Sequence, residues 1–131
     1  MIIIDTHVFV WEILEKSKIS TSALKALDYH ESEQELFICD ISFWEIGMLV
    51  GKEKIKLNTT VENFINQGLH LRNYQILSIN GHISQIVSEF ANEINSDPAD
   101  RIITSTALSN KASLVTADKN LRKVKGLKVI W

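Results

Sequence analysis

Short apolar runs alternate along the chain with longer stretches in which apolar residues recur at helical spacing. Uninterrupted apolar runs are typical of parallel strands that helices cover on both faces. We therefore expect strands at residues 2–4, 36–39, 75–79, 113–116 and 127–130. The helices expected between them span about residues 6–15, 20–29, 42–50, 59–69, 80–92 and 97 onward, followed by a short helix at 120–124. This β-α-α-β-α-α-β-α-α-β-α-β order predicts an α/β fold, with a parallel sheet and helices on both of its faces.

Four acidic residues lie at positions where solvated acids are not expected. Asp5 directly follows the first apolar run, and Asp118 comes two residues after another. Ligands of open α/β sheets bind outside the carboxyl ends of the strands, so both aspartates are expected at the mouth of such a site. Glu45 and Asp100 share helical stripes with apolar residues, which directs their carboxylates toward the core side.

Helix capping is the structural alternative for each of these acids. Ser42-x-x-Glu45 has the spacing of a capping box, in which the glutamate returns to the N-cap amide. Asp97 is a favourable N-cap ahead of a proline, and the other acids also precede or begin expected helices. Capping accounts for each acid singly, but it does not explain why four acids fall on one rim.

A cluster of acids carries an electrostatic cost. Two carboxylates about 5 Å apart repel by roughly 3 kcal/mol at an effective dielectric constant of about 20. A cation would offset this repulsion, and oxygen ligands without His or Cys suit Mg²⁺ or Mn²⁺ rather than zinc. The four histidines lack ligand spacing, and we expect each of them in a surface or packing position: His7, His30, His70 and His82.

Composition fits a single folded domain over residues 1–131. The chain has 45% hydrophobic and 23% charged residues, which excludes disorder, and its one cysteine, Cys39, excludes a disulfide framework. No apolar run approaches the roughly 18–20 residues of a membrane span. The apolar run at residues 2–4 meets Asp5 without the basic start of a signal peptide. We therefore expect a cytoplasmic protein without a membrane partner.

The net charge of −2 does not by itself suggest nucleic-acid binding, but the basic residues are unevenly distributed. Residues 111–128 carry six lysines or arginines against the single acid Asp118. A second, smaller group consists of Lys52, Lys54 and Lys56. A solvated surface is the favoured interpretation of such a lysine run when it is taken alone.

Four segments, taken in their order and spacing, add a further signal. They are Ile3-Ile4-Asp5-Thr6-His7-Val8, Ile41-Ser42-Phe43-Trp44-Glu45-Ile46, Asp97-Pro98-Ala99-Asp100-Arg101-Ile102-Ile103 and Leu114-Val115-Thr116-Ala117-Asp118-Lys119. Together they resemble the PIN-domain ribonucleases, especially the VapC-like toxins of bacterial toxin–antitoxin pairs. The resemblance covers essentially the whole chain, and it implies a three-layer α/β/α sandwich around a parallel sheet.

The resemblance also implies a site in which four acids are catalytic and bind Mg²⁺ or Mn²⁺: Asp5, Glu45, Asp100 and Asp118. No Cys–His or Ser–His arrangement suggests a covalent nucleophile. A metal held by carboxylates lowers the pKa of bound water and aligns it for in-line attack on phosphorus. The predicted function is therefore metal-dependent endoribonuclease activity, which hydrolyses RNA phosphodiester bonds.

Other positions would assist this site. Thr116 resembles the family's hydroxyl residue near the fourth acid and would orient a ligand or water, with Thr6 as a further supporting hydroxyl. Asp97 is a companion acid that we interpret mainly as a helix cap. The basic strip that follows Asp118 would hold the phosphate backbone of RNA. Its expected RNA-binding residues are Lys119, Arg122 and Lys123.

For a VapC-like protein the resemblance implies two protein partners. One is a small antitoxin whose tail occupies the site, and the other is a second copy of the chain in a homodimer. Phe9, Trp11 and the first helices are candidates for the antitoxin interface, although core packing explains them equally well. The alternatives are a PIN-domain nuclease of RNA processing and a non-catalytic domain that binds RNA or protein.

Two other magnesium-dependent classes fit the sequence less well. A haloacid-dehalogenase-type phosphatase needs a second aspartate two positions after Asp5, where this chain has His7. A receiver domain needs a phospho-acceptor aspartate after a middle strand, but the third expected strand ends at Ser78-Ile79-Asn80. The residues therefore favour the PIN-domain interpretation.

Overall fold

The structure is a computed structural model that describes residues 1–90, 93–94 and 96–131. In this part of the chain, five parallel strands form one sheet in the order β3-β2-β1-β4-β5. The strands are β1 (Ile2–Ile4), β2 (Leu36–Cys39), β3 (Gln75–Leu77), β4 (Ser113–Val115) and β5 (Lys128–Ile130). The helices are α1 (Thr6–Leu14), α2 (Thr21–Ser32), α3 (Ile41–Gly51), α4 (Val61–Leu71), α5 (Gly81–Glu89) and α6 (Pro98–Ser109), with short 3-10 turns η1 (Lys16–Lys18) and η2 (Leu121–Lys123). The predicted fold class and order of elements are confirmed.

The expected element boundaries hold to within a few residues. The main difference is α2, which continues to Ser32, whereas we expected this helix to end near residue 29. The expected end of α5 at residue 92 lies outside the described residues, and the described helix ends at Glu89. Four helices begin directly after a capping residue that the sequence offers. The side chain of each cap accepts a hydrogen bond from the backbone N–H three residues further on. These caps are Ser20 (3.1 Å), Thr60 (3.1 Å), Asn80 (2.9 Å) and Asp97 (3.0 Å).

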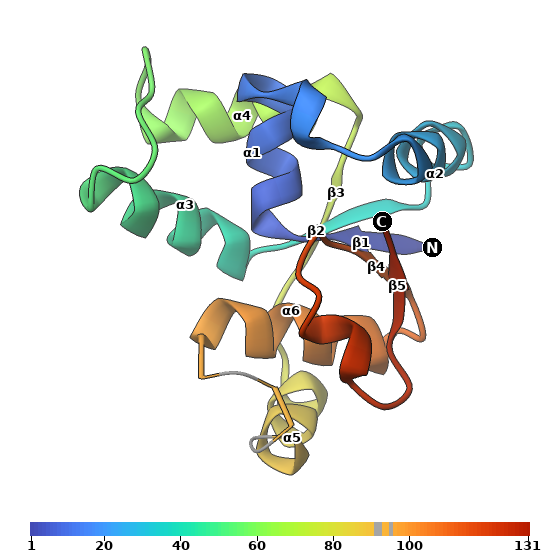
Figure 1. Cartoon of the computed structure of the whole chain (residues 1–131). Coiled ribbons are helices and arrows are strands. Elements are labelled where there is room, and N and C mark those ends of the chain that lie inside the picture. The colour runs from blue at the N-terminus through green and yellow to red at the C-terminus, as the bar shows by residue number, and fades with distance from the viewer. Residues whose placement is uncertain (91–92, 95) are drawn as a thin grey trace.

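Helices cover both faces of the sheet (Figure 1). In β1, Ile2 and Ile4 pack into the cluster that α1, α2 and α4 share, whereas Ile3 packs into the cluster of α6 on the other face. All three side chains are almost completely buried, and burying an isoleucine contributes about 1.5–3 kcal/mol. The triple-isoleucine run is therefore the central strand that its pattern predicts.

The register of β1 aligns the carboxyl ends of the central strands. Ile4 pairs with Ile38 of β2 and with Val115 of β4. The Asp5 amide donates to the Val115 carbonyl at 3.0 Å, which extends this ladder by one residue. The strands β2 and β3 lie on one side of β1, and β4 and β5 lie on the other. The strand order therefore reverses between β1 and β4, which makes this position the topological switch point.

Close packing of α1 on α4 fixes the position of Phe9. A Cβ added at Gly68 of α4 would lie 2.2 Å from Cζ of Phe9, so only glycine fits there. Phe9 is 1% exposed and packs edge-on against the rings of Phe64 and Tyr74. The suggestion that Phe9 belongs to a protein interface is therefore wrong, because its side chain is part of the core.

An ion network with a buried centre, Arg72 and Glu12, joins α1, α2 and the segment after α4. The guanidinium of Arg72 contacts Glu12 of α1 through Nε, and it reaches Asp28 and Glu31 of α2 at 2.7 Å and 2.8 Å. Glu12 also accepts the hydroxyl of Tyr74. Burial, reinforced by the charge of Glu12, raises the pKa of Tyr74, so the phenol stays protonated as a donor.

We predict that Arg72→Met lowers the free energy of unfolding by about 3–5 kcal/mol, because Glu12 then remains buried without its cation. Urea denaturation at neutral pH measures this change. The control is Lys25→Met on the exposed part of α2, which should change stability by less than about 0.5 kcal/mol. Equal effects of the two substitutions would show that the network contributes nothing specific.

Candidate functional site

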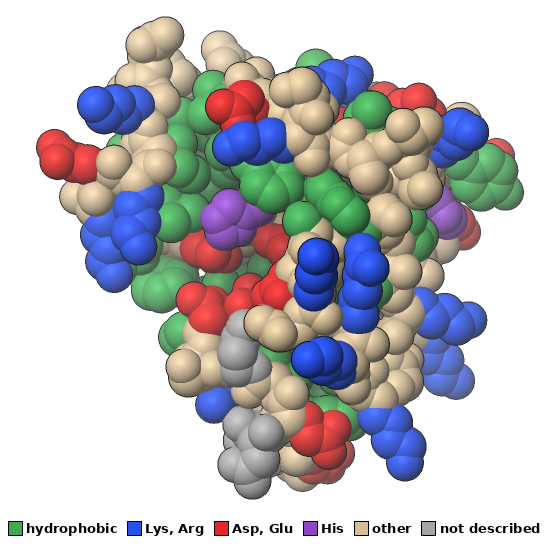
Figure 2. Space-filling view, in the orientation of Figure 1, with side chains coloured by type: hydrophobic (Ala, Val, Ile, Leu, Met, Phe, Trp, Pro, Cys, Tyr) green, Lys and Arg blue, Asp and Glu red, His purple; other side chains and the backbone are tan. Residues whose placement is uncertain are grey.

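Five carboxylates from four separate segments line one cavity of about 310 Å³. They are Asp5, Glu45, Asp97, Asp100 and Asp118. Figure 2 shows acidic side chains in a hollow of the surface, with a histidine at its edge. The structure therefore brings together the four acids that the sequence singled out and Asp97, the expected companion acid.

Asp5 is fixed in orientation by its neighbours at the switch point. It caps α1 by accepting the amide of His7 at 3.0 Å, and its second carboxylate oxygen accepts the hydroxyl of Thr116 at 2.5 Å. Burial by itself raises the pKa of Asp5, but the imidazole and amide of His7 and the Thr116 hydroxyl outweigh it and lower that pKa below the ordinary value. Asp5 is therefore an oriented carboxylate that is ionised at neutral pH.

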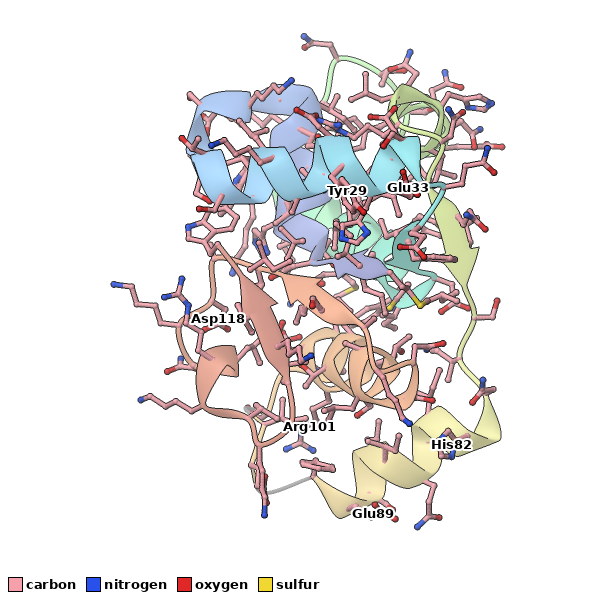
Figure 3. All side chains as sticks on the ribbon, turned by 90° about the vertical axis from the view of Figure 1, so that its right-hand side faces the viewer. Tyr29, Glu33, His82, Glu89, Arg101 and Asp118 are labelled. Carbon is pink, nitrogen blue, oxygen red and sulfur yellow. The ribbon has the colours of Figure 1, made fainter. Side chains whose placement is uncertain are left out.

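Thr116 connects the two strand-end acids. Its hydroxyl donates to Asp5 and accepts the backbone N–H of Asp118 at 3.1 Å. Asp118 in turn accepts the amide of Asn120 at 2.8 Å, which shapes the turn into η2. Figure 3 shows Asp118 on this turn, between β4 and η2. Thr116 thus contacts both strand-end acids, and its supporting role in the reaction stays a prediction.

Glu45 does not form the capping box that its spacing allows. The N-cap of α3 is Asp40, and Ser42 instead accepts the Thr6 hydroxyl at 2.9 Å. Oε2 of Glu45 is buried without a hydrogen-bond partner among the described residues. Burial raises the pKa of Glu45, and the nearby Thr6 hydroxyl only partly opposes this effect. This carboxylate therefore has an unused oxygen.

Asp97 and Asp100 enter the cavity from the first turn of α6. Asp97 accepts the amide of Asp100, so it is the helix cap that the sequence predicts, and it lines the cavity as well. A carboxylate in the first turn of a helix is favoured by the helix dipole, which partly offsets the crowding of charge. Capping and membership of the acidic cluster are thus compatible here.

His7 was missed by the sequence reasoning as a residue of the site. It is on the surface, as expected, but it lines the acidic cavity, with Nδ1 3.8 Å from a carboxylate oxygen of Asp5. The carboxylate of Asp5 raises the pKa of His7 more than burial lowers it, and Glu45 and Asp100 add to the increase. One feature of the sequence could have identified His7 as a site residue. It lies two residues after Asp5 and one helical turn before Trp11, which also lines the cavity.

The predicted RNA-binding residues lie beside the cavity rather than in it. Lys119, Arg122 and Lys123 are exposed on the turn and the 3-10 helix that follow Asp118. Figure 2 shows basic side chains on both sides of the acidic hollow. The surface around the acids is therefore basic, although the chain as a whole is not.

The donors in the cavity fit a hard divalent cation. The acids present oxygen ligands only, which suit Mg²⁺ or Mn²⁺, and the unpartnered oxygen of Glu45 could itself coordinate an ion there. Within residues 1–90, 93–94 and 96–131, no three His, Cys, Asp or Glu side chains already form a finished metal site. The fit to a divalent cation therefore rests on the chemistry of the oxygen donors rather than on a preformed coordination shell.

Comparison with known proteins identifies the family. The chain matches the family model of the PIN domain over residues 2–127. It is 30% identical over 122 residues to ribonuclease VapC22 of Mycobacterium tuberculosis, which corresponds to 92% of this chain and 89% of that protein. An α/β protein with this sequence match and this acidic switch point belongs to the PIN-domain family. The predicted relation to VapC-like proteins is therefore confirmed.

Solved structures share the same fold. VapBC2 from Rickettsia felis, bound to a DNA fragment from its promoter, has a TM-score of 0.75 and 21% identity, with 98% of this chain and 97% of that chain covered. FitAcB from Neisseria gonorrhoeae has a TM-score of 0.66 and 19% identity, with 98% and 96% covered.

Among the described residues, no helix is long and apolar enough to cross a membrane.

We predict that His7 titrates above the ordinary histidine pKa of about 6.5 in the presence of EDTA. A raised pKa in the folded state stabilises the protein fully below about pH 6.5, and this contribution is lost as the pH rises through the raised value. Nuclear magnetic resonance of the imidazole protons measures the pKa. Urea denaturation of wild type and His7→Gln at several pH values measures how the contribution of His7 to the free energy of unfolding falls as the pH rises.

Asp5→Asn should lower the pKa of His7, whereas Glu89→Gln, at the exposed end of α5, should leave it unchanged. A His7 that titrates at or below about 6.5 in the wild-type protein would contradict the charge coupling within the site.

Proposed function

We propose that this protein is an endoribonuclease that hydrolyses RNA phosphodiester bonds with the help of Mg²⁺ or Mn²⁺. The observation that carries the proposal is the convergence of carboxylates from β1, α3, α6 and β4 on one cavity at the switch point. Its relation to a ribonuclease, VapC22, over most of both chains supports RNA as the substrate class. A bound divalent ion would supply an activated water and charge for the leaving oxygen.

The chain's own residues divide into acids that would hold the ion and neighbouring groups that orient them. Asp5, Glu45, Asp100 and Asp118 would hold the ion, since their carboxylates line the cavity. Thr116 and the His7 amide keep Asp5 in one orientation, so this ligand is arranged before the substrate arrives. Thr6 positions Ser42 at the start of α3, the helix that carries Glu45.

The basic strip gives the substrate a place beside the acids. The phosphate backbone of RNA would be repelled by the acidic cavity alone, but exposed cations attract it. Lys119, Arg122 and Lys123 follow Asp118 directly and are exposed. Contacts of these side chains with phosphates would align the RNA so that one phosphodiester lies over the carboxylates.

The biological role that fits this activity best is that of a toxin in a toxin–antitoxin pair. The relation of the chain to the ribonuclease VapC22 and the fold that it shares with VapBC structures support this role. The proposal includes a small antitoxin that blocks the site and a homodimer of this chain. An upstream short reading frame with a DNA-binding motif would support the toxin role over an RNA-processing nuclease.

We predict that the purified protein cleaves structured RNA in Mg²⁺ or Mn²⁺ and stops in EDTA. Asp5→Asn and Asp100→Asn should each reduce cleavage by about a hundredfold or more, because each removes a charge that a metal site uses. Gel analysis of RNA fragments measures the rate, with Glu89→Gln as a remote acidic control at the wild-type rate. Full activity in chelator would refute metal dependence, and RNA binding without cleavage in either metal would favour the non-catalytic alternative.

We further predict that Asp100→Asn melts at or above the wild-type temperature in EDTA, because it removes repulsion within the acidic cavity. In saturating Mg²⁺ this variant should gain less stability than wild type, since a ligand stabilises the native state according to its affinity for it. Thermal denaturation in the two buffers measures both effects. A lower melting temperature in EDTA together with unchanged RNA cleavage would make Asp100 a structural residue only.

A further inference from the structure

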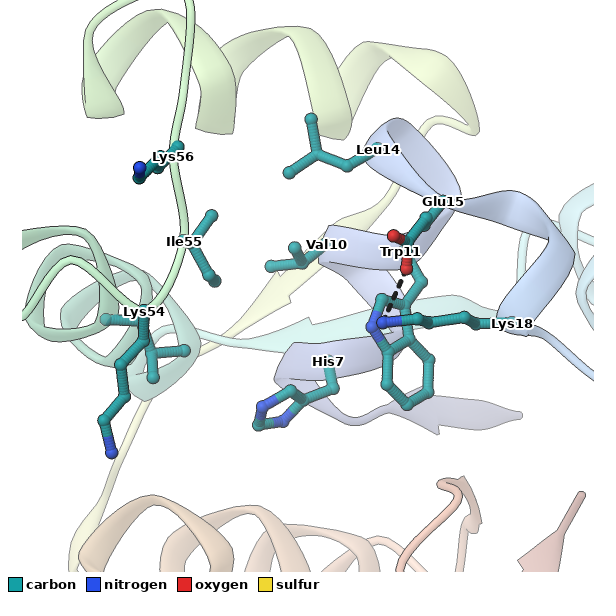
Figure 4. Close-up of a pocket in the computed structure, with 10 residues that line it drawn as sticks. His7, Val10, Trp11, Leu14, Glu15, Lys18, Lys54, Ile55 and Lys56 are labelled. Carbon is teal, nitrogen blue, oxygen red and sulfur yellow. Dashed lines mark ion pairs between the residues drawn. The ribbon is translucent and has the colours of Figure 1, made fainter.

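A second hollow adjoins the acidic cavity, and we refer to it as the α1 groove. It has a volume of about 400 Å³ and lies between α1 and the loop that joins α3 to α4 (Figure 4). Its walls include the apolar residues Val10, Leu14 and Ile55. His7 and Trp11 line both the groove and the acidic cavity, so the two hollows lie next to each other.

The charge of the α1 groove is opposite to that of the cavity. Lys18, Lys54 and Lys56 line it, and among its described lining residues the only acid is Glu15. Glu15 is already paired with Lys18 at 2.5 Å. Figure 4 shows Lys54 and Lys56 on the loop that faces α1, on either side of Ile55. These two exposed lysines leave the groove with a positive charge that suits an anionic ligand.

Trp11 gives the groove an aromatic surface next to the cavity. Its side chain is half-buried, with ring centroids 5.8 Å from His7 and 6.0 Å from Trp131. The ammonium of Lys18 lies 5.7 Å from the Trp11 ring centroid, in cation–π range. Aromatic rings beside cations are the combination that binds single-stranded nucleic acid, where bases stack and phosphates contact the charges.

We propose that the α1 groove binds the single-stranded RNA segment on one side of the bond to be cut. A base would lie against Trp11, and its flanking phosphates would contact Lys54 and Lys56. The inference rests on the proposed ribonuclease function, and it extends the RNA across the acids to the basic strip of Lys119, Arg122 and Lys123. Charge complementarity favours RNA over an apolar protein segment, which would use the walls but not the lysines.

Two variants and a matched control test the groove. A fluorescent single-stranded RNA of random sequence, about ten nucleotides long, would span a site of the expected size. Binding is measured by anisotropy at several salt concentrations, with Ca²⁺ in place of Mg²⁺ to limit cleavage. Trp11→Leu keeps an apolar side chain but should weaken binding about 5- to 100-fold, because base stacking is lost.

The double variant Lys54→Gln/Lys56→Gln should reduce the slope of log K against log salt by about 1.4, which is about 0.7 for each phosphate that a lysine no longer neutralises. Lys52→Gln is the control, because Lys52 is exposed in the same turn region but does not line the groove. It should leave the affinity and the slope unchanged. Unaltered melting temperatures for the lysine variants would show that the fold is intact.

The outcomes separate this proposal from the proposed function. Cleavage of RNA by the wild-type protein, with affinity and salt slope unchanged in both groove variants, overturns the groove proposal alone and leaves the groove to a protein ligand. Equal losses in the double variant and in Lys52→Gln would also overturn it, since the effect would then be general surface charge. Absence of RNA cleavage by the wild type would instead refute the proposed function.

Discussion

The pairing of β1 between β2 and β4 is the constraint on which the site depends. Each strand of this trio is short, and their register ends them at one edge of the sheet. The Asp5 amide still belongs to the ladder, while its carboxylate caps α1 and accepts the Thr116 hydroxyl from the neighbouring strand. One residue is therefore the end of a strand, the start of a helix and a member of the acidic cavity.

The site places like charges together, and the fold offsets that cost with local groups. Backbone amides at helix starts and the hydroxyl of Thr116 stabilise the ionised carboxylates. His7 places an imidazole at the rim, with Nδ1 3.8 Å from a carboxylate oxygen of Asp5, and this group is a cation when it is protonated. Glu45 has no such support for its buried oxygen. Natural proteins break local rules mainly at functional positions, and the unsupported oxygen of Glu45 fits that pattern.

Much of the architecture could be predicted from the sequence because its signals are local. The triple-isoleucine run, the caps at Ser20 and Asp97, and the alternation of strand and helix patterns each act over a few residues. Asp5 and Asp118 could be predicted because strand ends converge in a parallel sheet, and Glu45 and Asp100 because each shares a helical stripe with apolar residues. Their catalytic and metal-binding roles stay predictions.

The features that could not be predicted depend on contacts between distant segments. Glu12 is not among the acids that the sequence singled out, and only the fold brings Arg72 and Tyr74 to it. Phe9 was ambiguous because a helical aromatic residue packs inward or outward according to its neighbour, here Gly68. His7 lacked the spacing of a metal ligand, yet its helix begins at an acid of the site.

The long separation between β1 and β4 has a consequence for how the protein is made. The hydrogen bond from Thr116 to Asp5 spans 111 positions of the chain. During synthesis the ribosome therefore produces the first acid of the cavity long before the strand that completes it. Pairing across so large a loop is slow and must await the later segment. A nascent chain thus carries no assembled acidic cavity, and any harmful activity of the finished fold is withheld until translation has passed Asp118.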